Sequence, residues 1–164
     1  LLFITRSAGM AYNEVVVSLA GLPGAMASLR RFNRILAGST MGILALLAFT
    51  PLAGVWFERI SGLPPELAEL CRGGVALALL MPGYAVLQSW YQGVLVKSRA
   101  TRPVTEAVAL YFVVSATLLV VGTRLGTVTG LYWAILSFST AGVLQTAWLW
   151  WRSRGAIRWF AERS

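Results

Sequence analysis

Five apolar runs, each close to the length of a membrane-spanning helix, dominate this sequence of 164 residues. The hydrocarbon core of a bilayer is about 30 Å thick, and a helix needs about 20 apolar residues to cross it. Transmembrane β-strands are about 10 residues long and alternate in polarity, a pattern that we do not find here. We therefore predict an all-α fold: a polytopic transmembrane helix bundle in a single domain, residues 1–164. The predicted spans are residues 1–21, 35–57, 71–96, 104–122 and 128–151, followed by a tail at 152–164.

The charge content supports a membrane protein and argues against a nucleic-acid partner. Only 12% of the residues are charged, whereas a soluble domain usually carries about 25%. The formal net charge of +8 is compatible with nucleic-acid binding in principle. However, the basic residues lie between apolar runs, where the positive-inside rule and anionic lipid headgroups explain them. We expect membrane lipids, and no nucleic acid, as partners.

The distribution of basic residues predicts the orientation of the chain. The loop 25–34, the loop 97–102 and the tail lie on one side of the predicted topology and hold ten basic residues, against three on the other side. The positive-inside rule places the richer side in the cytoplasm. We expect an integral protein of the bacterial plasma (inner) membrane with these loops and the C-terminus cytoplasmic. The ten are Arg30, Arg31, Arg34, Lys97, Arg99, Arg102, Arg152, Arg154, Arg158 and Arg163, and the three are Arg59, Arg72 and Arg124.

Residues for most kinds of catalysis are missing. The chain has no histidine and no aspartate, and its one cysteine is Cys71, so no internal disulfide, thiolate or imidazole metal site, or hydrolase triad is available. No phosphate-binding loop of the G-x-x-x-x-G-K-[ST] type occurs. Glu66 and Glu69 follow Pro64-Pro65 and fit the first turn of a helix, where negative charge suits the macrodipole. We predict no enzyme activity, no metal and no cofactor.

A polar row interrupts the third apolar run, directly after Pro82-Gly83, and we predict that it binds substrate. Its members are spaced i, i+4, i+7 and i+8, which places them on one helical face. In hydrocarbon, such groups need another helix, water or a substrate as partner. We favour the lining of a cytoplasmic vestibule, in which the two glutamines meet water, and hydrogen bonding between helices is the alternative. The row is Tyr84, Gln88, Tyr91 and Gln92.

The first run, 1–21, contains Arg6, Asn13 and Glu14. Charged groups at membrane depth are costly and usually face a bundle interior or a cavity. The three residues are therefore candidates for ion coupling or for the cavity, although the Arg6 side chain is also placed to reach an interface.

Small residues and prolines predict how the spans pack. Gly38 and Gly42 form a small-xxx-small pair, a pattern that lets helix backbones approach closely. Pro51 and Pro82 should each break or kink a span. Glu106, near the start of the fourth span, is a dipole partner, a salt-bridge partner of nearby basic residues, or a gating charge.

The run LQSWYQGVLVKSRATRPVTEAVALY resembles the middle of a repeat in the multidrug/oligosaccharidyl-lipid/polysaccharide exporter superfamily, which we call MATE-like. The run GTRLGTVTGLYWAILSFSTAGVLQTAWL is similar to the outer turn and returning span of those transporters, and LRRFNR fits their basic loop. The resemblance implies the first five spans of a C-terminal six-helix half, two lobes around a central cavity, and alternating access. It also implies coupling to cations such as protons or sodium ions, or a lipid-linked substrate.

Within this superfamily, the run TRPVTE resembles a progressive-ankylosis-like branch more than a drug exporter. Drug-exporting members often use an acidic residue in the cavity, and here only Glu14 is available for that role. We therefore expect a secondary transporter or flippase fragment that moves a polar or amphiphilic solute: a drug, a lipid-linked saccharide or an organic anion. The remainder of the same polypeptide, an N-terminal lobe, would be its partner. A non-transporting membrane scaffold and an intramembrane transferase are the alternatives.

Overall fold

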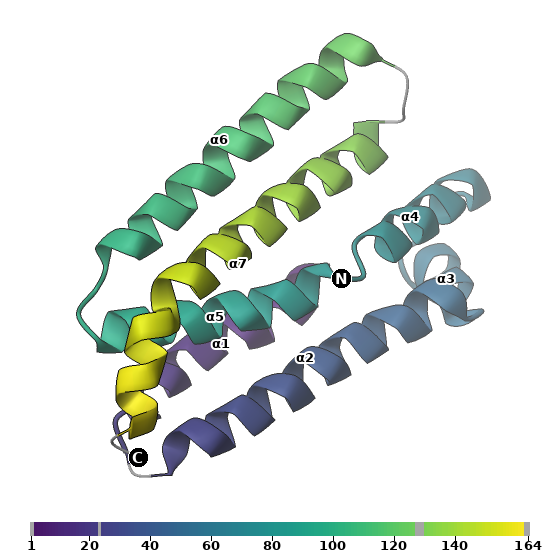
Figure 1. Cartoon of the computed structure of the whole chain (residues 1–164). Helices are drawn as coiled ribbons and strands as arrows, with labels where there is room; N and C mark the ends of the chain where they lie inside the picture. The colour runs from purple at the N-terminus through teal and green to yellow at the C-terminus, as the bar shows by residue number, and fades with distance from the viewer. Residues whose placement is uncertain (1, 23, 127–129, 163–164) are drawn as a thin grey trace.

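The computed structural model describes residues 2–22, 24–126 and 130–162, and every regular element among them is a helix. This confirms the predicted all-α fold (Figure 1). In chain order the elements are α1 (Leu2–Leu19), α2 (Ala25–Phe49), α3 (Leu52–Gly54), the π-helical turn η1 (Val55–Ile60), α4 (Pro65–Leu77), α5 (Met81–Lys97), α6 (Arg102–Leu125) and α7 (Gly130–Glu162).

Three segments among the described residues are long and apolar enough to cross a membrane: Ala25–Phe49, Pro65–Lys97 and Arg102–Leu125. These three are compatible with an integral membrane protein. In α1, Arg6, Asn13 and Glu14 lower the mean hydropathy, and hydroxyl and amide side chains do the same in α7. The prediction of about five spans is therefore supported for three segments, and it stays a prediction for α1 and α7.

Proline explains the breaks within the apolar segments. Pro82 has no N–H to offer to the carbonyl of Ala78, four residues earlier, and its ring would clash with that carbonyl. The Ala78 carbonyl instead accepts a hydrogen bond from the Met81 N–H, at 2.9 Å, and residues 78–80 form the turn between α4 and α5. The same effect ends α2 at Phe49, shortly before Pro51. Both predicted proline breaks are confirmed.

Two predicted boundaries do not match the helices. Residues 25–34 are the first part of α2 and not a separate connection before a span at 35, because the buried stripe of Met26, Leu29 and Asn33 continues in register to Thr40. Residues 152–162 likewise continue α7 and do not form a separate tail. The buried positions Leu149, Ser153 and Phe160 extend its inner face.

Helix α5 lies at the centre of the bundle and packs against α1, α2 and α7, while α6 pairs with α7 (Figure 1). The main apolar core joins α1, α2, α5 and the end of α7 through buried side chains. They are Tyr12, Val16, Ala20, Met26, Leu29, Val86, Trp90, Val94 and Phe160. A smaller core joins α5, α6 and α7 through Leu95, Ala107 and Leu149.

Close helix contacts occur at other glycines than the sequence suggested. Gly38 and Gly42 are exposed, and a Cβ added to either would meet no atom within 4 Å, so this pair joins no helices in the described structure. A Cβ on Gly93 of α5 would lie 2.7 Å from the Val16 side chain of α1. A Cβ on Gly122 of α6 would overlap the Trp133 indole of α7. The expectation for Gly38 and Gly42 is therefore wrong for contacts within this chain.

The basic segments gather at one end of the bundle. Figure 1 shows the start of α2, the α5–α6 connection and the end of α7 at that end. This grouping agrees with the charge count from the sequence, because these segments hold nine of the ten basic residues, and the tenth, Arg163, lies outside the described residues. That this end is cytoplasmic stays a prediction.

Candidate substrate groove

An open groove lies between α2, α5 and α7, and we call it the solute groove. Its volume is about 620 Å³. Most of its walls are apolar, as is usual for small-molecule sites. Polar groups come from Asn33 and Arg34 on α2, Tyr84 and Tyr91 on α5, and Thr146 on α7. The apolar walls are Ala37, Met41, Leu80, Gly83, Leu87, Val143, Ala147 and Trp150.

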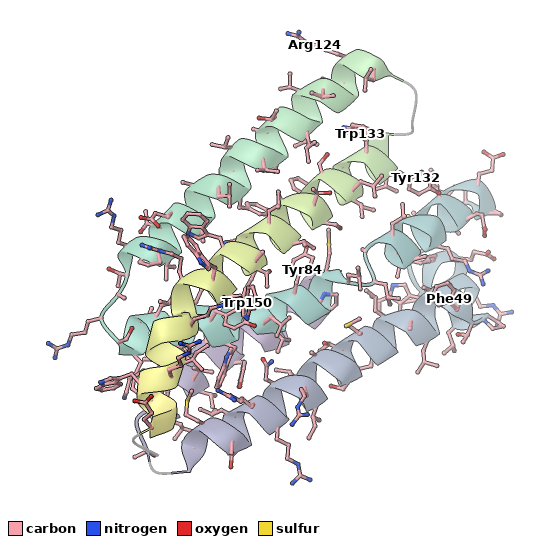
Figure 2. The ribbon with its side chains drawn as sticks, viewed as in Figure 1. Phe49, Tyr84, Arg124, Tyr132, Trp133 and Trp150 are labelled. Carbon is pink, nitrogen blue, oxygen red and sulfur yellow. The ribbon has the colours of Figure 1, made fainter. Side chains whose placement is uncertain are left out.

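Two of the four predicted substrate residues, Tyr84 and Tyr91, line the solute groove. Both side chains are half-buried. Tyr84 lies close against α7, because a Cβ added to Gly142 would come within 2.6 Å of its ring. Figure 2 shows Tyr84 between α5 and α7. That these two residues bind substrate stays a prediction.

Gln88 does not meet water in this structure, which corrects the prediction made for it. Its side chain is 6% exposed and lies between α5 and α7. Its Nε2 lies 3.1 Å from each of three acceptors: the Gly142 carbonyl, Gln145 Oε1 and Thr146 Oγ1. The physical reason is that α7 offers matching polar groups at the same depth, so hydrogen bonding between helices takes the place of solvent. Gln92, the fourth member of the row, is half-buried and is not among the groove residues.

The predicted coupling residues lie apart from the solute groove. Asn13 sits at the contact of α1 with α5, where a Cβ on Gly93 would come within 3.1 Å of its Oδ1. That oxygen is buried and accepts no hydrogen bond from the described residues. Glu14 is exposed on α1, and the side chain of Arg6 lies outside the described side chains. The described structure therefore does not bring Asn13 or Glu14 to the groove.

One end of the solute groove opens into a basic cavity that sequence reasoning missed, and we call it the arginine pocket. Its volume is about 610 Å³. It shares Asn33, Arg34, Leu87, Tyr91 and Trp150 with the groove. Its remaining residues are Arg30, Trp90, Arg154, Ile157 and Arg158. The sequence did contain a signal for it, because Arg30/Arg34 and Arg154/Arg158 are two i, i+4 pairs and each pair shares a helical face. The count of basic loops used these residues only for topology.

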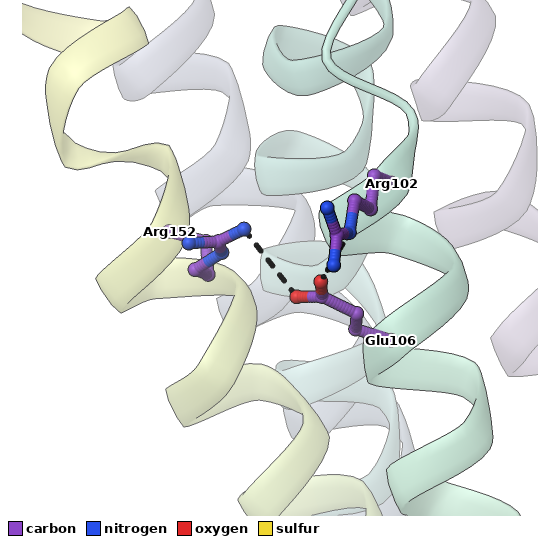
Figure 3. Close-up of polar contacts among 3 residues, drawn as sticks. All are labelled: Arg102, Glu106 and Arg152. Atoms are coloured by element: carbon purple, nitrogen blue, oxygen red, sulfur yellow. Dashed lines mark hydrogen bonds and ion pairs between the residues drawn. The ribbon is translucent and has the colours of Figure 1, made fainter.

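A larger cavity of about 900 Å³ lies at the same end of the bundle, beside the α5–α6 connection. Lys97, Arg99 and Arg152 contribute to its lining, but none of the predicted substrate residues does. Arg152 is neutralised there by Glu106, whose carboxylate also pairs with Arg102, at 3.4 Å and 3.1 Å respectively (Figure 3). The salt-bridge interpretation of Glu106 is therefore confirmed.

Comparison with models of known protein families, with curated proteins and with solved structures finds no match to this chain. The MATE-like resemblance therefore stays an interpretation of the sequence. The solute groove and the arginine pocket are the features of the described structure that bear on function.

Proposed function

We propose that this chain is part of an integral membrane carrier, a secondary transporter or flippase, that moves an amphiphilic solute along the solute groove by alternating access. The observation that carries the proposal is the combination of a mostly apolar groove with the phenol groups of Tyr84 and Tyr91 and the amide of Asn33. A mostly apolar site with a few polar groups can bury the apolar part of a solute and fix its orientation.

The break at Pro82 supports a moving element. Interrupted helices in transporters place backbone groups and polar side chains beside the substrate, and rocking of one part against another gives access to either side. Here α5 begins at Met81, directly after the break, and carries both groove tyrosines. A rotation of α5 about residues 78–80 would therefore change the width of the groove.

A lipid-scrambling assay tests the carrier. The full-length protein is reconstituted in vesicles with a trace of fluorescently labelled phosphatidylglycerol, and dithionite is added outside. A carrier brings inner-leaflet label to the outside, so that fluorescence continues to fall after the outer leaflet has reacted. Ala147→Trp should slow this phase because it fills the groove, whereas Ala116→Trp on the exposed face of α6 should not. Equal traces with and without protein would contradict the carrier.

One observation favours the scaffold alternative. The buried Gln88 side chain on α5 donates hydrogen bonds to Gly142 and Gln145 on α7, so this part of the polar row joins two helices. Thiol labelling separates the two functions. In a background with Cys71→Ser, Tyr91→Cys should react with a water-soluble thiol reagent if the groove is a solute path, and Gln88→Cys should be protected. In a scaffold whose groove is filled by another helix, both positions would be protected.

A further inference from the structure

The cavity of about 900 Å³ beside the α5–α6 connection lies where helices begin and end, and we call it the end cavity. Its walls come from residues just after α1, the end of α5, the start of α6 and the last turns of α7. Two of the membrane-length segments, Pro65–Lys97 and Arg102–Leu125, meet at this connection. The end cavity therefore lies at the ends of the apolar segments, and we expect its ligand to come from the water side.

The end cavity has an apolar floor and a basic rim. Leu95, Pro103 and Phe160 are buried side chains that form part of the floor. Lys97 and Arg99 are exposed and line the same cavity. An apolar hollow beside cationic groups suits a ligand that has both an apolar part and negative charge.

The charges on the rim are not neutralised within the described part of the chain. None of the described residues that line the end cavity is a carboxylate, and neither Lys97 nor Arg99 takes part in the salt bridges recorded there. Lys97 also suits the negative end of the α5 dipole, but Arg99 lies beyond the helix end. A third basic residue of the lining, Arg152, is paired with Glu106. Two cations are therefore available to an acidic partner.

Arg99 is held in a backbone conformation that glycine usually adopts. Its φ is 60°, the only positive φ of a non-glycine residue in the described part of the chain. The Arg99 N–H donates to the Val96 carbonyl and the Ala100 N–H to the Leu95 carbonyl, both at 2.9 Å, which is the Schellman pattern of a helix end. Glycine takes this conformation without strain, whereas a residue with a Cβ is strained there. The strain indicates a role for the arginine side chain itself.

Exposed apolar side chains on the rim suit a protein partner. Trp159 is 47% exposed, Leu22 is 53% exposed, and both line the end cavity. The Trp159 ring packs edge-on against Phe160, with 4.8 Å between ring centroids. Tryptophan and arginine around a pocket that takes an apolar anchor are typical of the residues that dominate protein interfaces. A bilayer lipid fits less well, because the walls are helix ends and a turn.

We propose that the end cavity docks an acidic peptide segment of a partner protein. An apolar side chain of that segment lies on the floor formed by Leu95, Pro103 and Phe160, and its carboxylates face Lys97 and Arg99. This site goes beyond the proposed carrier function and does not depend on it.

Peptide binding is measured by fluorescence anisotropy with the full-length protein in phosphatidylcholine nanodiscs. The probe is a labelled peptide of glutamates on both sides of one phenylalanine. One comparison peptide has serine in place of the phenylalanine, and the other has glutamine in place of each glutamate. We expect the probe to bind saturably and each comparison peptide to bind about tenfold more weakly or less. No saturable binding at millimolar probe, or equal binding of the three peptides, would overturn the proposal.

Gly155 offers a way to block the end cavity without disturbing the bundle. It lines the cavity, and a Cβ added to it would meet no atom within 4 Å. Gly155→Trp should therefore occupy the cavity and weaken probe binding about tenfold or more. Gly38→Trp is the matched control, because Gly38 has the same free space but lies outside the cavity, and it should change binding by less than about twofold. Equal binding by the two variants would overturn the site.

Arg99→Gly removes the charge without straining the turn. Probe binding should weaken about fivefold or more, because a charge-assisted contact is lost, while the unfolding temperature without peptide should not fall. Arg31→Gln removes the same charge from an exposed position outside the cavity and should change binding by less than about twofold. An equal loss in both variants would overturn the proposal in favour of general electrostatic attraction.

A lipid headgroup is the competing occupant, and native mass spectrometry of the same protein detects it. Phosphatidylglycerol that stays bound to the wild-type protein, is lost in Gly155→Trp and excludes the probe would assign the end cavity to a lipid and overturn the peptide site. The scrambling assay involves no peptide, so failure of the carrier would leave this site standing.

Discussion

Two buried amide side chains, Gln88 on α5 and Asn33 on α2, have nearly the same exposure but opposite surroundings. Gln88 is enclosed by α7, which supplies three acceptors within 3.1 Å of its Nε2. Asn33 lines an open groove and keeps an Oδ1 with no partner. The comparison separates a closed side of α5, where helices seal against each other, from an open side, where a cavity remains. Gln88 on the closed side joins two helices by hydrogen bonds, whereas the buried Asn33 oxygen beside the groove is left without a partner.

The largest expected loss of stability follows a substitution at Gly93, where α5 packs closely against α1. Gly93→Leu would push a side chain into Val16, since even a Cβ would lie 2.7 Å from it. We expect a loss of about 3 kcal/mol in the free energy of unfolding, measured by circular dichroism during denaturation in mixed detergent micelles. Gly38→Leu is the control, because its Cβ meets no atom within 4 Å and leucine favours the helix. Equal stability of the two variants would show that α1 and α5 are not in close contact.

Gln88→Leu should destabilise the bundle by about 1 kcal/mol, the usual range for a hydrogen bond between membrane helices. The loss leaves Gln145 Oε1 without its donor. A further change, Gln145→Leu, should recover part of the loss because both partners are then apolar. The same unfolding assay measures both variants. Gln92→Leu serves as the control, and a cost for it equal to that of Gln88→Leu would contradict the assignment of the closed side.

In contrast to Gln88→Leu, Asn33→Leu should stabilise the ligand-free protein against unfolding by about 1 kcal/mol, because it removes an unsatisfied buried acceptor. Unfolding in the absence of lipid measures this effect. Destabilisation comparable to that of Gln88→Leu would show that Asn33 has a partner in the folded protein and belongs to the closed side.

The smallest effect concerns the paired arginines at the α6–α7 contact. Glu106→Gln removes the carboxylate that Arg102 and Arg152 share, and it should cost about 0.5 kcal/mol at low salt because the pairs are partly exposed. The cost should fall as salt is added. Thermal unfolding at two salt concentrations checks this, with Glu69→Gln, an exposed residue of α4, as the control. A cost that does not change with salt would point to packing instead of charge.

Much of the fold followed from local chemistry, while only part of the candidate site did. Pro82 and Pro51 predicted the breaks, and Pro65 and Glu66 predicted the start of α4. The polar row lies on α5, and two of its members, Tyr84 and Tyr91, line a groove, while their role in binding stays a prediction. Asn33 was missed because a single asparagine within an apolar helical stripe carries no spacing signal.

Helix geometry explains why members of the polar row on α5 have different surroundings. At about 100° per residue, the four members of the row spread over about 100° of the α5 surface, which is wider than one neighbouring helix covers. Helix α7 therefore encloses Gln88, while Tyr91 extends past its edge into the space toward α2. Periodicity identifies the face, but it does not show where the neighbouring helix ends.

The sequence by itself determined the helical class, the proline breaks, the apolar character of three membrane-length segments and the basic charge of the segments at one end of the bundle. These properties depend on neighbours within a few residues along the chain. Only the tertiary structure decided which amides are sealed and which are open, and that the arginines of α2 and α7 share one pocket. Those outcomes depend on contacts such as that of Gln88 with Gln145, 57 residues apart, which local sequence patterns do not encode.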